Sequence, residues 1–163
     1  MKRKQNKIGL TLVEILVAMA IIAILAAGLY SVSNYIEKQA QIKLTESTIE
    51  ILSTAIEQYH DFYGKFPDVN DNNGIPADCD RCMERLYYRL SLAPDAKNIL
   101  NQINSSMIVN VYKDEGPNIF PEIVDAWGTD FKYIYNSGDN FPLIESAGPD
   151  KDFNKTADNI SSK

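Results

Sequence analysis

The sequence predicts an α+β protein in which one long N-terminal helix packs against a small C-terminal antiparallel sheet. Three observations lead to this fold class. An apolar run near the N-terminus is followed by an amphipathic repeat, proline is absent before Pro67, and short β-type segments separated by turn residues occupy the second half. The chain of 163 residues is long enough for one compact domain with attached segments.

The first element is an apolar run from Leu10 to Leu29, which only Thr11, Glu14 and Gly28 interrupt. About 20 helical residues span about 30 Å, which matches the hydrocarbon core of a bilayer. The run follows four basic residues with no acid among them, namely Lys2, Arg3, Lys4 and Lys7. Positive residues stay cytoplasmic, so the C-terminal part is expected to cross the membrane.

Three interpretations of this run compete: an ordinary membrane anchor, a cleaved secretory signal and a prepilin-type segment. Ala26, Ala27 and Gly28 could serve as a conventional cleavage site. Glu14 favours the prepilin-type segment, because a carboxylate inside an apolar helix costs about 2–3 kcal/mol and usually has a partner. A secretory signal has no use for such a residue.

The second element is an amphipathic stripe that continues the helix to about Tyr63. Apolar and small side chains recur in it at spacings of three and four: Ile42, Thr45, Ile49, Leu52, Ile56, Tyr59 and Tyr63. Gly64 and Pro67 then predict the end of the helix. This stripe is expected to pack on the rest of the head.

The remaining elements are short. Met83–Leu92 and Pro94–Ile103 are predicted helices, and Met107–Tyr112 is a predicted strand. Phe131–Tyr135 and Phe141–Glu145 flank a turn-forming Asn-Ser-Gly-Asp segment, which predicts a β-hairpin.

Charge is distributed unevenly along the chain. The first nine residues carry +4 and the whole chain −6, so the part after Gly9 carries −10. Binding to nucleic acid needs a basic surface, which this acidic part does not provide. The composition favours a divalent cation as a partner.

The acidic segment Ser146–Ile160 is the candidate site for that cation. Oxygen-bearing side chains stand at alternate positions in it, namely Asp150, Asp152, Asn154, Thr156 and Asp158, with Asn159 beside them. A hard cation such as calcium takes 6–8 oxygens. Lys155 and Ser161 stand where an EF-hand has glycine and glutamate, so the segment is no EF-hand. The alternative is a solvated acidic terminus.

The segment Gly9–Met19, GLTLVEILVAM, resembles the processing motif of type IV pilins and type II secretion pseudopilins. The resemblance implies a pilin-like fold, cleavage after Gly9, N-methylation of Leu10 and an assembly role for Glu14. The chain departs from the family pattern at Leu10, where phenylalanine is commoner. We expect Glu14 to neutralise the new amine on Leu10 of a neighbouring subunit, since an unpaired charge is expensive in a low-dielectric helix bundle.

The C-terminal segment resembles the calcium loop of the major pseudopilins of type II secretion systems. The resemblance implies the ligands Asp150, Asp158, Asn159 and the backbone carbonyl of Ala147, and the alternate oxygens add Asp152. Asn159 replaces an acid of the family pattern, which is expected to weaken the site. Residues 125–128 (DAWG) and 63–67 (YGKFP) also resemble family segments.

Cys79 and Cys82 form one C-x2-C pair. A local disulfide is the preferred interpretation, because the head is expected outside the cytoplasm. Free thiols are the main alternative, and zinc with His60 is disfavoured because a structural zinc site takes four ligands. No phosphate loop, carboxylate pair or catalytic triad stands out, so no enzymatic activity is predicted.

The expected organisation is a leader (residues 1–9), a membrane or filament-core helix (10–29), an amphipathic helix (30–63) and a periplasmic head (64–163). The expected function is a calcium-stabilised subunit of a type II secretion pseudopilus. The expected partners are identical subunits, minor pseudopilins, prepilin peptidase and the inner-membrane assembly platform. A type IV pilin and a calcium-binding periplasmic module that never polymerises are the alternatives.

Overall fold

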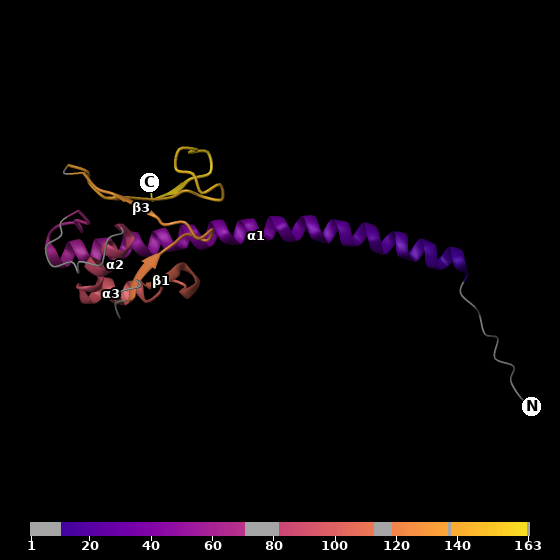
Figure 1. Ribbon diagram of the computed structural model, residues 1–163, viewed down its shortest axis with the longest axis horizontal. Helices are drawn as coiled ribbons and strands as arrows, with labels where there is room; N and C mark the ends of the chain where they lie inside the picture. The colour runs from indigo at the N-terminus through magenta and orange to yellow at the C-terminus, as the bar shows by residue number, and fades with distance from the viewer. Residues whose placement is uncertain (1–10, 71–81, 113–118, 137, 163) are drawn as a thin grey trace, which may run out of the picture. The chain divides into compact units, whose positions relative to one another are not determined.

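The structure is a computed structural model that describes residues 11–70, 82–112, 119–136 and 138–162 (Figure 1). The chain forms two compact units, one up to Gln39 and one from Ala40 onward. Helix α1 (Leu12–Tyr63) begins in the first unit and ends in the second. Its 52 residues make it about 78 Å long at 1.5 Å per residue.

Helix α1 ends where the sequence predicts. Gly64 takes φ +69°, a left-handed conformation that glycine adopts without a steric penalty. Its N–H donates to the carbonyl of His60 at 2.7 Å, which satisfies one of the last helical carbonyls. The chain then turns back toward the head.

In its described residues, the second unit contains two further α-helices and five strands. The helices are α2 (Cys82–Ser91) and α3 (Pro94–Leu100), and a 3-10 turn, η1 (Ser105–Met107), follows them. The strands are β1 (Ile108–Tyr112), β2 (Ile119–Ile123), β3 (Lys132–Ile134), β4 (Leu143–Ser146) and β5 (Ile160–Ser161). The predicted α+β class is therefore confirmed.

The strands form two antiparallel sheets, whereas the sequence predicted one. Strand β1 pairs with β2, and β4 lies between β3 and β5. The predicted hairpin corresponds to β3 and β4, with Tyr133 opposite Ile144. Strand β2 was missed because Pro121 lies in its middle, and proline is tolerated only at the edge of a sheet.

The core of the second unit is built around one face of α1. Figure 1 shows this part of α1 between the β3–β5 sheet and the group formed by α2, α3 and β1. Leu52, Ala55 and Ile56 are fully buried there. They pack with Leu86 of α2, Leu100 of α3 and Ile144 of β4. The predicted amphipathic stripe is thus the centre of the core.

Candidate functional site

The N-terminus of α1 carries a reciprocal capping arrangement. Glu14 Oε2 accepts hydrogen bonds from the backbone N–H and the hydroxyl of Thr11, each at 2.8 Å. In return, the backbone N–H of Glu14 donates to Thr11 Oγ1 at 3.3 Å. This is the capping box of a Thr-x-x-Glu sequence. Glu14 was singled out from the sequence, but Thr11 was missed, although this spacing is itself a helix-start signal.

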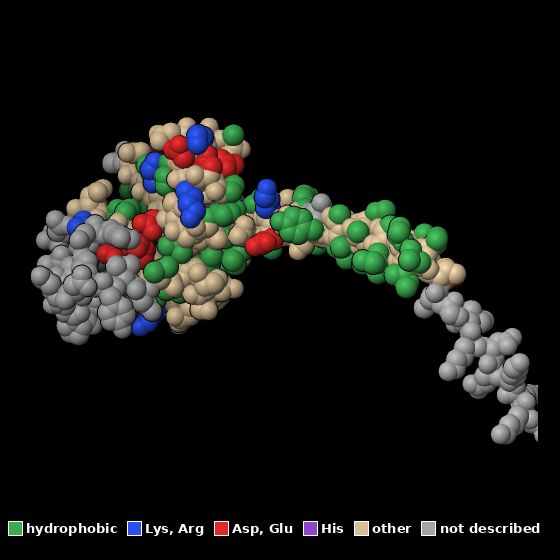
Figure 2. All heavy atoms as spheres, turned by 45° about the vertical axis from the view of Figure 1, so that its right-hand side comes forward, with side chains coloured by type: hydrophobic (Ala, Val, Ile, Leu, Met, Phe, Trp, Pro, Cys, Tyr) green, Lys and Arg blue, Asp and Glu red, His purple; other side chains and the backbone are tan. Residues whose placement is uncertain are grey.

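The helix that follows Glu14 is apolar and exposed. Figure 2 shows hydrophobic side chains over the visible face of this part of α1. Leu16 is 62 % exposed and Ile24 is 73 % exposed. By length and composition, α1 qualifies as a membrane-spanning helix. Burial of these side chains in lipid or among neighbouring helices would remove a large apolar area from water.

The acidic loop, defined here as residues 147–159, connects β4 to β5 and is closed at its base. Ser146 pairs with Ile160 across these two strands. Gly148 has φ +70°, and a side-chain Cβ at this position would overlap the backbone carbonyl of Asp158. Glycine is therefore required there, both for the turn and for the close approach of the two ends of the loop.

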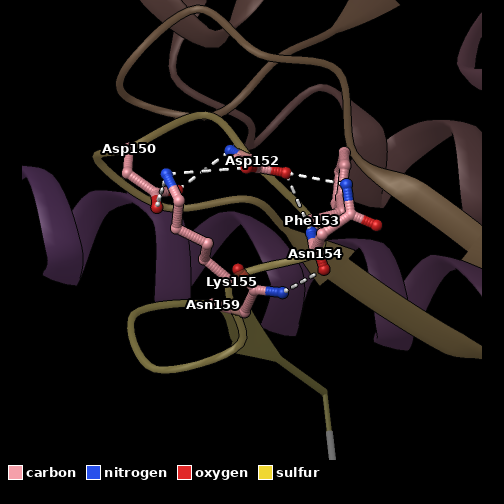
Figure 3. A network of polar contacts seen from close by, with 6 residues as sticks. All are labelled: Asp150, Asp152, Phe153, Asn154, Lys155 and Asn159. Atoms are coloured by element: carbon pink, nitrogen blue, oxygen red, sulfur yellow. Dashed lines mark hydrogen bonds and ion pairs between the residues drawn. The ribbon is translucent and has the colours of Figure 1, made fainter.

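Two of the predicted ligands lie around one ammonium group (Figure 3). Lys155 Nζ is 3.4 Å from Asp150 Oδ2 and 3.5 Å from Asp152 Oδ2. The pKa of Asp152 is lowered, chiefly by the hydrogen bond from the backbone N–H of Asn154. The side-chain amide of Asn154 and the positive charge of Lys155 lower it further. The pKa of Lys155 is raised, chiefly by its hydrogen bond to the Asp150 carboxylate and then by the negative charge of that carboxylate. The loop thus already holds a cation between two carboxylates.

Asn159 supplies a further oxygen. Its Nδ2 donates to Glu145 Oε1 at 3.1 Å. The same group donates to the carbonyl of Phe153 at 3.4 Å (Figure 3). Its Oδ1 is buried and accepts no hydrogen bond from the described residues. A buried acceptor without a donor is costly, and a cation would satisfy it. Oxygen is the ligand atom that a hard divalent cation prefers.

The structure brings only some of the predicted ligands together. Within the described ranges, no three side chains of His, Cys, Asp or Glu form a metal-binding group. Asp150 and Asp152 both form an ion pair with Lys155. Asp158 lies elsewhere in the loop, with its backbone carbonyl close to Gly148. Ala147, the predicted carbonyl ligand, is fully buried beside this approach.

A buried polar chain supports the base of the acidic loop. The N–H of Gly148 donates to Ser146 Oγ at 3.0 Å, and the Ser146 hydroxyl donates to Asp125 Oδ2 at 2.7 Å. The other oxygen, Asp125 Oδ1, accepts from the N–H groups of Trp127 and Thr129 at 3.0 and 2.8 Å. Ser146 and Asp125 were not predicted to support the loop. No sequence pattern indicates this pair, because the two side chains are 21 positions apart and meet only in the folded chain.

The same turn is tied to α1. The N–H of Ala126 donates to Thr45 Oγ1 at 3.2 Å, and Thr45 is fully buried. The segment 125–128, which resembles a family turn, therefore links the long helix to the base of the acidic loop. Gly128 in this turn has φ +78°, as its last position requires.

Cys82 is the first residue of α2, and Cys79 lies outside the described residues. The predicted disulfide therefore stays a prediction. The Sγ of Cys82 is 4.0 Å from the carbonyl of Tyr133, and desolvation raises the pKa of its thiol. His60 stacks on Phe66 with ring centroids 4.5 Å apart and lies 3.9 Å from Asp61. These contacts are those of a packed surface histidine.

A comparison with known protein families found a match at the N-terminus. Residues 4–30 match the prokaryotic N-terminal methylation motif. The match covers residues 4–9 of the expected leader and the first part of α1, including Thr11 and Glu14. No curated protein and no solved structure matched the chain.

The methylation motif supports the pilin and pseudopilin class of precursors. It implies processing by prepilin peptidase and assembly into pilus-like filaments, and it indicates a structural subunit rather than an enzyme. Together with the apolar start of α1, it agrees with a single-pass membrane anchor. The predicted processing residues Gly9 and Leu10 lie within the matched segment but outside the described residues.

Proposed function

We propose that this chain is a structural subunit of a type II secretion pseudopilus. Prepilin peptidase cleaves it between Gly9 and Leu10 while the apolar half of α1 is anchored in the inner membrane and the head lies in the periplasm. The mature subunit then joins identical subunits and minor pseudopilins on an assembly platform, and the filament acts in protein secretion. The observation that carries the proposal is the methylation motif with Glu14 at the start of an exposed apolar helix.

Glu14 changes its partner during assembly in this proposal. In the single chain its carboxylate is satisfied by Thr11 of the same helix. Cleavage creates a positive amine on Leu10, and the attraction between opposite charges grows as water is excluded. Glu14 of an incoming subunit therefore gains more from the amine of its neighbour than from its own cap. The pair sets the axial register of the new subunit.

Calcium is the second part of the proposal. The side chains of Asp150, Asp152, Asp158 and Asn159 and the carbonyl of Ala147 would hold it. Bound there, the ion would neutralise the carboxylates and would hold the two ends of the loop together. The supporting observations are the buried Asn159 Oδ1 without a donor and a loop base that is already closed by β4 and β5.

Processing and assembly are tested together in the native host. Mass spectrometry of the mature chain is expected to find a methylated Leu10 at the N-terminus. Glu14→Ala is expected to be processed but absent from sheared or cross-linked filaments. Thr11→Ala is the matched control: it removes the hydroxyl of the capping box but leaves the carboxylate, and it is expected to retain most of the assembly. An unprocessed chain, or normal assembly of Glu14→Ala, contradicts the proposal.

The type of filament is tested by deletion of the chain. Loss of exported proteins from the medium, with motility and DNA uptake unchanged, supports a secretion pseudopilus. The opposite result identifies a type IV pilin. Calcium binding is tested by calorimetry on the full-length chain in detergent micelles, where wild type is expected to bind and Asp150→Ala to lose binding. An absence of heat at millimolar calcium contradicts the calcium part alone.

A further inference from the structure

Asparagines followed two positions later by a hydroxyl residue form a pattern that the proposed function does not use. The sequence Asn-x-Ser/Thr, with any residue except proline in the middle, is the acceptor signal for N-linked glycosylation. The chain contains it at three places, which begin at Asn104, Asn154 and Asn159. Because the modification adds a bulky polar group, the acceptor has to lie on the surface with an accessible side-chain amide. The structure distinguishes the three asparagines on this ground.

Two of these asparagines already use their side-chain nitrogen in hydrogen bonds. Asn154 Nδ2 donates to Asp152 Oδ1 at 2.9 Å (Figure 3). Asn159 is only partly exposed, and its Nδ2 donates to Glu145 Oε1 at 3.1 Å and to the Phe153 carbonyl at 3.4 Å. A sugar on Asn159 would break at least one of these two bonds, and a sugar on Asn154 would crowd the carboxylate that its nitrogen contacts.

Asn104 lies on an exposed turn that is anchored on both sides. It directly precedes η1, and Ser105 and Ser106 are exposed with it. The residues that flank this tripeptide, Ile103 and Met107, are only 5 % and 1 % exposed and fix the turn to the core. A group attached to Asn104 would therefore extend into solvent without displacing a core side chain.

The oxygen and the nitrogen of the Asn104 side chain have different surroundings. Asn104 Oδ1 accepts hydrogen bonds from the backbone N–H and from the hydroxyl of Ser106, each at 3.0 Å. No residue that the structure describes accepts a hydrogen bond from Asn104 Nδ2. The hydroxyl of the acceptor pattern thus holds the amide by its oxygen, and the two N–H donors of the amide stay without a competing bond from the described chain.

We propose that Asn104 is an N-glycosylation site. The donor is a sugar chain linked through diphosphate to a membrane lipid, and a membrane-bound oligosaccharyltransferase catalyses the transfer. Asn104 Nδ2 forms a bond to the anomeric carbon of the first sugar while the bond from that carbon to the diphosphate oxygen breaks. The amide loses one proton and the lipid diphosphate leaves, so the reaction needs no oxidant or reductant. The inference rests on the proposed location of the head outside the cytoplasm, because this acceptor pattern is used in exported proteins.

Two adjacent serines provide matched variants. Ser106→Ala removes the hydroxyl that the acceptor pattern requires. Ser105→Ala removes the same group from the middle position, which accepts any residue except proline. Ser106→Thr keeps a hydroxyl at the required position, and Asn104→Gln keeps an amide but replaces the acceptor asparagine.

The experiment is peptide mass spectrometry of the full-length chain purified from its native host, for the wild type and the four variants. Wild type, Ser105→Ala and Ser106→Thr are expected to carry the mass of a sugar chain on the peptide that contains Asn104. Asn104→Gln and Ser106→Ala are expected to lose this mass completely. The peptides with Asn154 and Asn159 are expected to be unmodified in all five proteins. Thermal melting of the variants verifies that each of them is folded.

An unmodified Asn104 in the wild type would overturn the inference, and so would a modification that persists in Ser106→Ala. A sugar chain on Asn154 or Asn159 in place of Asn104 would overturn it as well. The N-terminal peptide of the same sample tests the proposed function separately. A chain that still begins before Leu10 contradicts processing by prepilin peptidase, whatever the state of Asn104. The two failures are therefore distinguished by different peptides.

Discussion

The two halves of α1 have the same backbone and opposite surroundings. In the first half Leu16 is 62 % exposed and Ile22 is 64 % exposed, whereas in the second half Leu52 and Ile56 are completely buried. The first half is apolar on all sides, and the second has an apolar stripe between charged residues such as Glu50 and Glu57. A helix that is apolar all round is solvated by lipid or by other helices, whereas a striped helix packs against its own domain.

This contrast separates assembly from stability. The large apolar side chains of the first half are exposed, so they can contribute to anchoring and to contacts between subunits. Side chains of the second half hold the head together. Mutations in the two halves should therefore differ in which measurement they change.

The largest effect is expected from truncation of the core. Leu52→Ala should lower the free energy of unfolding of the head by about 2–5 kcal/mol, because it leaves a cavity in a fully packed site. Leu16→Ala removes the same group from an exposed site and should leave the thermal melting of the head unchanged. The two variants are compared by thermal melting of the detergent-solubilised protein. Equal melting temperatures would contradict the view that only the second half of α1 stabilises the head.

The next effect is expected at the base of the acidic loop. Ser146→Ala removes the hydroxyl that donates to buried Asp125 and accepts from Gly148. A buried carboxylate oxygen without its donor should cost about 1–3 kcal/mol in chemical denaturation. An unchanged denaturation midpoint would show that water replaces the hydroxyl and that the loop is not supported by this chain of hydrogen bonds.

A smaller effect should separate two threonines on the second half of α1. Thr45→Val removes the acceptor for the N–H of Ala126 and should cost about 0.5–1.5 kcal/mol. Thr54→Val is the control, because its hydroxyl only donates to the Glu50 carbonyl on an exposed face. Equal thermal stability of the two variants would mean that the contact between α1 and the 125–128 turn contributes little.

The smallest effect concerns pH. The pKa of Asp152 is lowered in the folded head, chiefly by the N–H of Asn154, below its unfolded value of about 3.9. Its contribution to stability is therefore present above about pH 4 and is lost as the pH falls through the lowered pKa. Asp152→Asn should flatten the acid side of a melting-temperature curve measured in the absence of metal. A curve parallel to that of the wild type would contradict this prediction.

Much of the fold was predictable because its signals are local. Periodicity predicted α1, Gly64 and Pro67 predicted its end, and the turn residues around 136–139 predicted the β3–β4 hairpin. Strand β5 has two residues, too few to show a pattern, and β2 contains Pro121. Both are strands only because a neighbouring strand pairs with them.

The same distinction between local signals and long-range contacts applies to the candidate sites. The sequence by itself determined the apolar helix, Glu14 and the oxygen-rich segment, because each depends on residues that are close along the chain. Only the tertiary structure decided that Ser146 bonds Asp125 and that Thr45 bonds the 125–128 turn, because these contacts join residues 21 and 81 positions apart. It also decided that the ammonium of Lys155 lies beside the two carboxylates, since the sequence spacing allows this contact but does not require it.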